Sequence, residues 1–225
     1  KTMYNNKNFG TFSLSWSFLG DIRLEKDSKG NVSILNSGIQ SFLPQQLPGT
    51  ALYDSDSDNL NIQQLLFQGA SLERLFSVQT DGTYKATDKD KATLTKVGNV
   101  YQLKEKDGTT IVFRTDGQLD YVQNTDGYKI SATYNTNNKL TKLTASDGDF
   151  FNLTYNTQGR ISKITDQTGQ ATNYTYDANG QSLLSIADSK GKTSFTYGNP
   201  YDPRFGASFF KLEVTKSYFS SCILF

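Results

Sequence analysis

An aromatic side chain recurs every 21 residues through the middle of the chain, and other positions recur in step with it. The aromatic column consists of Phe113, Tyr134, Tyr155, Tyr176 and Tyr197. Four residues later stand the turn residues Gly117, Asn138, Gly159 and Gly180, and six and nine residues later most copies carry Leu, Ile or Val. A period of about 20 to 50 residues indicates a repeat architecture.

The third copy shows what one unit contains. A polar turn ends at Gly159, where a positive φ is easiest for glycine. Arg160 to Thr165 is rich in β-branched residues, and a second turn ends at Gly169. Gln170 to Tyr176 then alternates between two faces. Each unit is therefore predicted to be a β-hairpin that leans on the next.

Two irregularities refine this pattern. Ile161 and Ile164 are three residues apart, so both can face the core only if a bulge or bend separates them. In the fourth copy, Leu183 and Ile186 come one residue late, and Tyr197 restores the period. A drift that corrects itself indicates structural units rather than a chance pattern.

These observations predict an all-β fold in which stacked 21-residue hairpins form a continuous curved sheet. Residues 1–112 are expected to be an irregular β lead-in that starts or caps the sheet, and residues 113–197 hold four repeats. Within the lead-in, Asn59 to Phe67 suggests a short helix. Residues 198–225 form a non-repeat tail, either a displaced strand or a truncated, disordered end.

The chain opens with Lys1 and ends in Ser221 to Phe225, and we interpret it as a piece of a longer protein. A cut through stacked hairpins exposes an unpaired strand edge. Because the tail is rich in aromatic and aliphatic residues, we expect the isolated segment to self-associate through its C-terminal end.

The units resemble the Rhs, or YD, repeat, whose pattern is Tyr-Asp, two residues, Gly-Arg-Leu, a Thr-Asp turn, Gly and a return to Tyr. Tyr155 to Asp166 and Tyr176 to Gly180 carry the similarity, which covers roughly residues 113–197. Phe12 to Asn36 is similar to the Trp-containing lead-in that often precedes such repeats. The departures are Asn for Asp at 135 and 156, Asn for Gly at 138 and Gln for Arg at 181, so the Tyr-Asp pair is a turn-forming preference and not a chemical site.

The resemblance implies a function. In Rhs elements, toxin-complex C components and teneurins, such repeats form a β-sheet that spirals into a hollow shell, and in bacterial members the shell encloses a toxic C-terminal domain. We therefore expect a non-catalytic wall segment of a secreted or surface-exposed bacterial protein, whose partner is its own C-terminal toxin or cargo domain. The alternative is a module that binds carbohydrate or a cell-surface protein.

Charge and composition exclude several other functions. The chain has 23 basic and 22 acidic residues, and its net charge of +1 is too small to favour binding to nucleic acid or to an anionic membrane. No apolar run reaches the roughly 18–20 residues of a membrane span. Histidine is absent, which excludes a Ser-His-Asp triad, a Cys-His pair and His-containing zinc sites. Cys222 is the single cysteine and cannot form an internal disulfide.

The remaining candidates for chemistry favour structural interpretations, and no cofactor is expected. Asp54, Asp56 and Asp58 begin like a calcium loop, but Leu65 stands where a bidentate Glu is needed, so a solvated acidic loop is preferred. Other aspartates lie in predicted turns, at 107, 126, 147 and 166, where hydrogen bonds to the backbone explain them. Because no carboxylate pair stands out, we do not predict an enzyme.

The aromatic column itself has two interpretations. Its rings could be platforms on which sugars or bases stack. A tyrosine at a fixed place in a strand more often packs within the wall against the neighbouring repeat. The sequence favours packing.

Overall fold

The computed structural model describes residues 16–35, 66–68, 73–87, 90–197 and 212–218, which fall into two compact units, Lys1–Asn152 and Leu153–Phe225. The described residues contain strands and one short 3₁₀ helix, η2 (Leu19–Asp21), and no α-helix. The predicted all-β fold of consecutive antiparallel hairpins is confirmed. The calcium candidates Asp54, Asp56 and Asp58 lie outside the described residues.

The part of the lead-in from Trp16 to Ala86 forms two small antiparallel sheets within the first unit, whereas its later strands, from Thr93 on, belong to the sheet of the repeats. One pairs β1 (Trp16–Phe18) with β4 (Leu66–Gln68). The other has the strand order β2-β3-β5-β6 and consists of β2 (Arg23–Lys26), β3 (Val32–Leu35), β5 (Arg74–Val78) and β6 (Tyr84–Ala86). The short helix suggested for residues 59–67 is wrong for Leu66 and Phe67, which pair with β1, and residues 59–65 lie outside the described residues.

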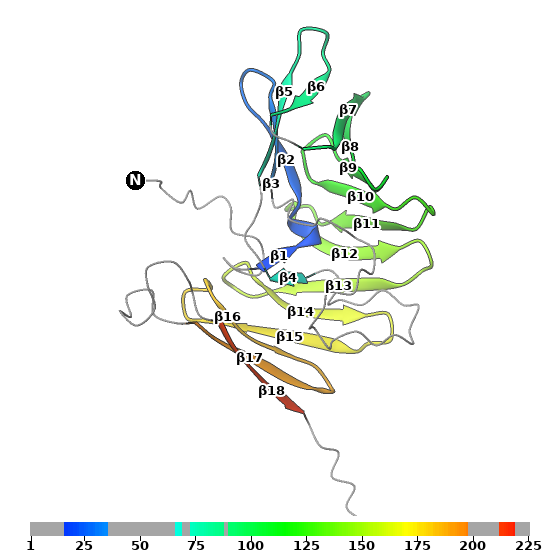
Figure 1. Cartoon of the computed structure of the whole chain (residues 1–225). Coiled ribbons are helices and arrows are strands. Elements are labelled where there is room, and N and C mark those ends of the chain that lie inside the picture. The colour runs from blue at the N-terminus through cyan, green and yellow to red at the C-terminus, as the bar shows by residue number, and fades with distance from the viewer. Residues whose placement is uncertain (1–15, 36–65, 69–72, 88–89, 198–211, 219–225) are drawn as a thin grey trace, which may run out of the picture. The chain divides into compact units, whose positions relative to one another are not determined.

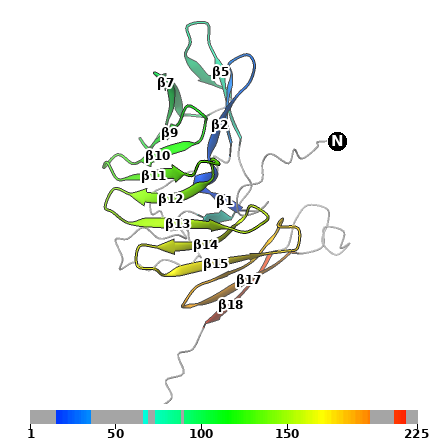
Figure 2. The same ribbon diagram turned by 180° about the vertical axis from the view of Figure 1, so that it is seen from behind.

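The following strands of the first unit pair with one another in chain order, each antiparallel to the next (Figures 1 and 2). They are β7 (Thr93–Val97), β8 (Val100–Lys104), β9 (Thr110–Phe113), β10 (Leu119–Gln123), β11 (Lys129–Tyr134), β12 (Leu140–Ala145) and β13 (Phe150–Tyr155). Neighbours in sequence are thus neighbours in space, as the period requires.

The second unit repeats this arrangement. Its strands, again paired in chain order, are β14 (Ile161–Asp166), β15 (Ala171–Tyr176), β16 (Leu183–Ala187), β17 (Gly191–Tyr197) and β18 (Leu212–Tyr218). The tail therefore contains a strand at Leu212–Tyr218, antiparallel to β17, as the displaced-strand interpretation requires. The division into lead-in, repeats and tail stays a prediction, since the boundary between the compact units falls inside β13.

The bulge required by the three-residue apolar spacing is present in the hairpins. Thr133 lies opposite Lys142 whereas Tyr134 lies opposite Leu140, so Thr141 is the extra residue. Leu140 and Leu143, on either side of it, are both buried. The same register shift places Asp120 and Leu184 as extra residues in their strands.

The third copy follows the same geometry in the second unit. Ile161 and Ile164 are both buried, as the bulge prediction requires. Ser162, between them, donates from its hydroxyl to the backbone oxygen of Thr154 at 3.2 Å, as Thr141 does to Thr133 at 3.2 Å. These side-chain bonds compensate for the ladder that a bulge interrupts.

Turn length explains the slip of the fourth copy. In the second and third copies the turn is closed by a backbone bond across four residues, Asn135 to Lys139 and Asn156 to Arg160. In the fourth copy Asp177 bonds to Ser182, so this turn is one residue longer. The next turn closes from Asp188 to Gly191 and is one residue shorter than the turn that begins at Asp166, which restores the register.

The core of the first unit lies between the repeat strands and part of the lead-in. Phe18, Ile22 and Leu24 of the lead-in are buried. The lead-in lies close against β12 at Gly20, where an added Cβ would lie 2.3 Å from Cδ2 of Leu140. One face of these repeat strands is therefore covered by the chain that precedes them.

Candidate functional site

Two tyrosines of the aromatic column join the two strands of their own hairpin. The Tyr134 hydroxyl donates to the backbone oxygen of Leu119 at 3.0 Å, and the Tyr176 hydroxyl donates to that of Ile161 at 2.6 Å. Both rings are half-buried, and the Arg114 guanidinium lies 5.0 Å from the centre of the Tyr134 ring. This geometry supports wall packing, while the structural role assigned to Phe113, Tyr134, Tyr155, Tyr176 and Tyr197 stays a prediction that substitution can test. The side chain of Tyr197 lies outside the described part.

The residue after each tyrosine closes the turn that follows. Oδ1 of Asn135 accepts from the backbone N–H groups of Asn137 and Lys139, each at 3.0 Å. Oδ1 of Asn156 likewise accepts from Gln158 at 3.0 Å and Arg160 at 2.9 Å. Because an amide oxygen serves as well as a carboxylate here, Asn can replace Asp of the Tyr-Asp pair.

The turn residues that stand four positions after each of the first four aromatic residues form what we call the fourth-position column, and they adopt the left-handed conformation. φ is +84° at Gly117, +77° at Gly159 and +66° at Gly180, which confirms the expectation for Gly159. Asn138 stands in the same column at +57°, where asparagine is tolerated better than most residues.

Side chains five residues after the aromatic position connect consecutive turns, and we call these connections rungs. Gln118 Nε2 donates to the Asn138 backbone oxygen at 2.9 Å, and Arg160 Nε donates to that of Gly180 at 2.6 Å. Gln158 Nε2 adds a bond to the backbone oxygen of Ala178 at 2.7 Å. Sequence reasoning did not predict the rungs, although long polar side chains at 118, 139, 160 and 181 are a signal that could have done so.

Turns at the other end of the strands are also connected. Tyr128 hydrogen-bonds to Asp147, and burial, together with that carboxylate, raises the pKa of the Tyr128 hydroxyl to about 12. Of the four aspartates expected in turns, three accept bonds from the backbone there, whereas at Asp126 the acceptor is the side chain of Asn124. Asp107 accepts from Thr109 at 2.9 Å, Asp147 from Asp149 at 3.1 Å and Asp166 from Thr168 at 2.9 Å.

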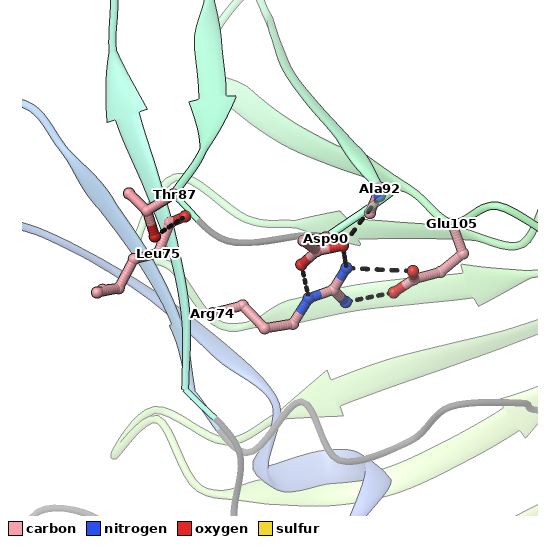
Figure 3. Close-up of polar contacts among 6 residues, drawn as sticks. All are labelled: Arg74, Leu75, Thr87, Asp90, Ala92 and Glu105. Atoms are coloured by element: carbon pink, nitrogen blue, oxygen red, sulfur yellow. Dashed lines mark hydrogen bonds and ion pairs between the residues drawn. The ribbon is translucent and has the colours of Figure 1, made fainter.

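A cluster of three charged side chains joins the lead-in to the repeat sheet (Figure 3). Arg74 on β5 donates from Nε and Nη2 to the two carboxylate oxygens of Asp90, at 2.6 and 2.8 Å. Its Nη1 and Nη2 also donate to the two oxygens of Glu105, which follows β8. All three side chains are about four-fifths buried. No sequence signal predicted this cluster, because its members come from separate segments.

Each charged side chain of the Arg74 cluster has a partner of opposite charge within the cluster. Burial opposes the charge on Arg74, but its hydrogen bonds to Asp90 and Glu105 outweigh burial and raise its pKa. Hydrogen bonds from Arg74 lower the pKa of Asp90, whose Oδ1 also accepts from the Ala92 N–H. Asp90, held ionised by this guanidinium, is unsuited to proton transfer near neutral pH. The cluster is a structural connection.

Aromatic rings also lie on the face of the repeat sheet opposite the core. Lys129 Nζ lies 5.1 Å from the centre of the Tyr121 ring, and Lys142 Nζ lies 3.8 Å from that of Phe150. A sugar stacking on either ring would have to displace a lysine ammonium held there by cation–π attraction. These rings therefore do not support the carbohydrate-binding alternative.

In the part of the chain that the structure describes, no three His, Cys, Asp or Glu side chains are placed to hold a metal ion. No helix among the same residues is long and apolar enough to cross a membrane.

Comparison with known proteins identifies one family. The sequence profile described as Teneurin YD-shell matches residues 21–204. No curated protein matches the chain. The crystal structure of TcdB2-TccC3-Cdc42 aligns with 79% of this chain at 13% identity and a TM-score of 0.32, and this chain spans 9% of that one. A porin-like protein from Bacteroides uniformis ATCC 8492 aligns with 94% of the chain, and 98% of its own, at 10% identity and a TM-score of 0.25.

Proposed function

The chain belongs to the teneurin YD-shell family, and we propose from this that it is a non-catalytic stretch of wall in a container that encloses the C-terminal domain of its parent protein. The observation that supports this most is the set of side-chain bonds that connect consecutive turns within each compact unit. Gln118 bonds to Asn138 and Arg160 bonds to Gly180, in each case in the turn of the following repeat, and the hydroxyls of Tyr134 and Tyr176 close their own hairpins.

A wall needs such connections more than it needs a reactive group. Stacked repeats contact only their neighbours, so the bonds between neighbours determine whether the array holds together. Among the described residues, several carboxylates are engaged in structure: Asp107 and Asp166 bond to the backbone of their turns, and Asp90 and Glu105 bond to Arg74. This supports a container in preference to an enzyme.

The enclosed domain and the location are parts of the same proposal. The enclosed partner is a toxic or other cargo domain that follows the repeats, and the parent protein is secreted or displayed on a bacterial surface. Membership of a family described as a shell supports a wall segment.

Limited proteolysis of the parent protein tests this function. If the repeats enclose the C-terminal domain, that domain should resist protease in the full protein and should be digested when it is produced alone. Equal digestion rates in the two preparations would overturn the proposal. In the full protein, Phe113→Ala should loosen the wall. We expect the C-terminal domain of this variant to be digested faster than in the unmodified full protein and more slowly than when it is produced alone.

A further inference from the structure

The backbone oxygen in the fourth-position column accepts a hydrogen bond in three turns. Asn138 and Gly180 accept from side chains of the preceding repeat, Gln118 at 2.9 Å and Arg160 at 2.6 Å. The oxygen of Gly117, in the first repeat, accepts instead from the backbone N–H of Leu24 on β2, at 2.7 Å. The same acceptor is thus satisfied by a different part of the chain at the start of the array.

No preceding repeat offers a donor to the first turn. Counting back 21 residues from Gln118 leads to Val97, whose side chain has no donor and is 58% exposed. Gly117 is buried, and a buried backbone oxygen without a partner is costly. Leu24 therefore supplies at the first turn what the preceding repeat supplies at later ones.

The fit between β2 and the first turn also explains why Gly117 is a glycine. A Cβ added there would lie 2.0 Å from the backbone oxygen of Leu24, which is a severe clash. The column itself accepts a side chain, because Asn138 occupies it at φ +57°. Gly169, in the other glycine column, has φ +87° and nothing within 4 Å of an added Cβ. Glycine is thus required at 117 by the close contact with Leu24 as well as by the positive φ.

Further contacts hold the hairpin of β2 and β3 in place. Arg23 forms an isolated antiparallel bridge with Gln118. Leu24 and Ile34, which lie opposite each other in the hairpin, are both buried. β3 pairs with β5, which carries Arg74 and its bonds to Asp90 and Glu105. The hairpin is therefore attached at the first turn and, through its sheet, at the Arg74 cluster.

We propose that the β2–β3 hairpin is the N-terminal cap of the turn edge of the repeat wall: it docks on the first turn and supplies the donor that the preceding hairpin, β8–β9, does not offer. The proposal rests on the proposed function, because a cap presupposes a wall built of repeats. The partner that this turn edge fits is an extended strand that offers a backbone N–H, and Leu24 is that donor.

Amide hydrogen exchange in the unmodified chain gives the first test. Alternate N–H groups of a strand point the same way, so those of Leu24 and Lys26 both point away from β3. Leu24 has an acceptor, Gly117, whereas the Lys26 N–H has none among the described residues. We expect the Leu24 amide to exchange at least about tenfold more slowly than the Lys26 amide. Equal rates would overturn the proposal.

Two matched variants give the second test. Gly117→Asn introduces a side chain at φ +84° and against Leu24, while Gly169→Asn introduces the same residue at φ +87° into open space. We expect Gly117→Asn to accelerate exchange at Leu24 by about tenfold or more and Gly169→Asn to leave it unchanged. Equal effects would overturn the proposal, and if Gly117→Asn does not fold, the rates in the unmodified chain still decide. These measurements need no cargo, so a failure of the protease experiment would leave the cap standing.

Discussion

The repeats and the lead-in are both built of short antiparallel strands, but they are held in place by different kinds of contact. Within the repeats, the characteristic bonds recur between neighbours, such as Gln118 to Asn138 and Arg160 to Gly180, both 20 residues apart. The lead-in instead depends on single contacts between distant segments, such as Arg74 to Glu105 and Leu24 to Gly117. A repeated contact tolerates variation in one copy, whereas a unique contact has no substitute.

The largest expected effect comes from the core of the repeat sheet. Phe113 is fully buried between Tyr101 and Leu119 on neighbouring strands. Phe113→Ala should lower the free energy of unfolding by about 3–5 kcal/mol through lost burial and the cavity left behind. Val97→Ala is the matched control, because Val97 is largely exposed, and it should cost less than about 1 kcal/mol. Urea unfolding of both variants measures the difference, and similar losses would contradict the core assignment.

The Arg74 cluster should show the next largest effect. Arg74→Met keeps an apolar stem but leaves Asp90 and Glu105 together without their cation. We expect a loss of roughly 2–3 kcal/mol, somewhat less than for a fully buried ion pair because the cluster is partly solvated. Adding Asp90→Asn should recover part of the loss by removing one of the two like charges. Urea unfolding of the single and double variants checks this, and an unchanged single variant would show that the lead-in is held in another way.

The dependence of stability on pH should be flat near neutrality and fall at both extremes. The chain has no histidine, so few groups titrate between about pH 5 and 9. Arg74 lowers the pKa of Asp90, so its contribution is complete above the usual value of about 3.9 and is lost as pH falls through the lower folded value.

At the alkaline end the sign reverses. Burial raises the pKa of Tyr128 to about 12 and also raises that of Tyr174. Their contribution is complete below the usual tyrosine value of about 10 and is lost as pH rises through the folded values. Urea midpoints from pH 3 to 11 should therefore form a plateau with two falling limbs. A step between pH 6 and 7 would contradict this description.

The smallest effect should come from the hydroxyl groups of the aromatic column. Tyr134→Phe and Tyr176→Phe each remove one bond to a backbone oxygen and should cost about 1 kcal/mol. Tyr121→Phe is the control, because the Tyr121 hydroxyl has no partner among the described residues, and its ring keeps the contact with Lys129. Thermal melts of the three variants would separate them, and equal melting temperatures would show that the column is held by its rings alone.

The sequence was most informative where a contact repeats. The 21-residue step predicted the hairpins and the positive φ at Gly159, and the spacing of Ile161 and Ile164 predicted a bulge or bend that lets both face the core, where both are buried. The bulge could not be placed from sequence, because either strand of a hairpin can carry the extra residue. The register shows that it follows the first of the two apolar residues, at Thr141 in the second copy.

The unique contacts could not be predicted in this way. Nothing in the local pattern of β5 indicates that Arg74 binds both Asp90 and Glu105, because the folded chain alone brings these segments together. Likewise, the glycine at 117 suggested a turn, which is correct, but not that β2 lies against it. The Arg74 cluster and the contact between β2 and Gly117 both depend on which distant segments the folded chain brings together.

If the 21-residue hairpin is the unit from which this wall is built, the deletion of one whole unit should be tolerated, and the deletion of half a unit should not. Removal of residues 156–176 joins Tyr155 to Asp177, so a tyrosine still precedes the turn at Asp177–Ser182. Removal of residues 156–165 deletes a single strand and reverses the direction of every strand that follows. We predict that the 21-residue deletion keeps a strand-dominated far-UV circular dichroism spectrum and a cooperative unfolding transition, and that the ten-residue deletion loses both. If the two variants behave alike, the repeat is a pattern in the sequence and not the building unit of the fold.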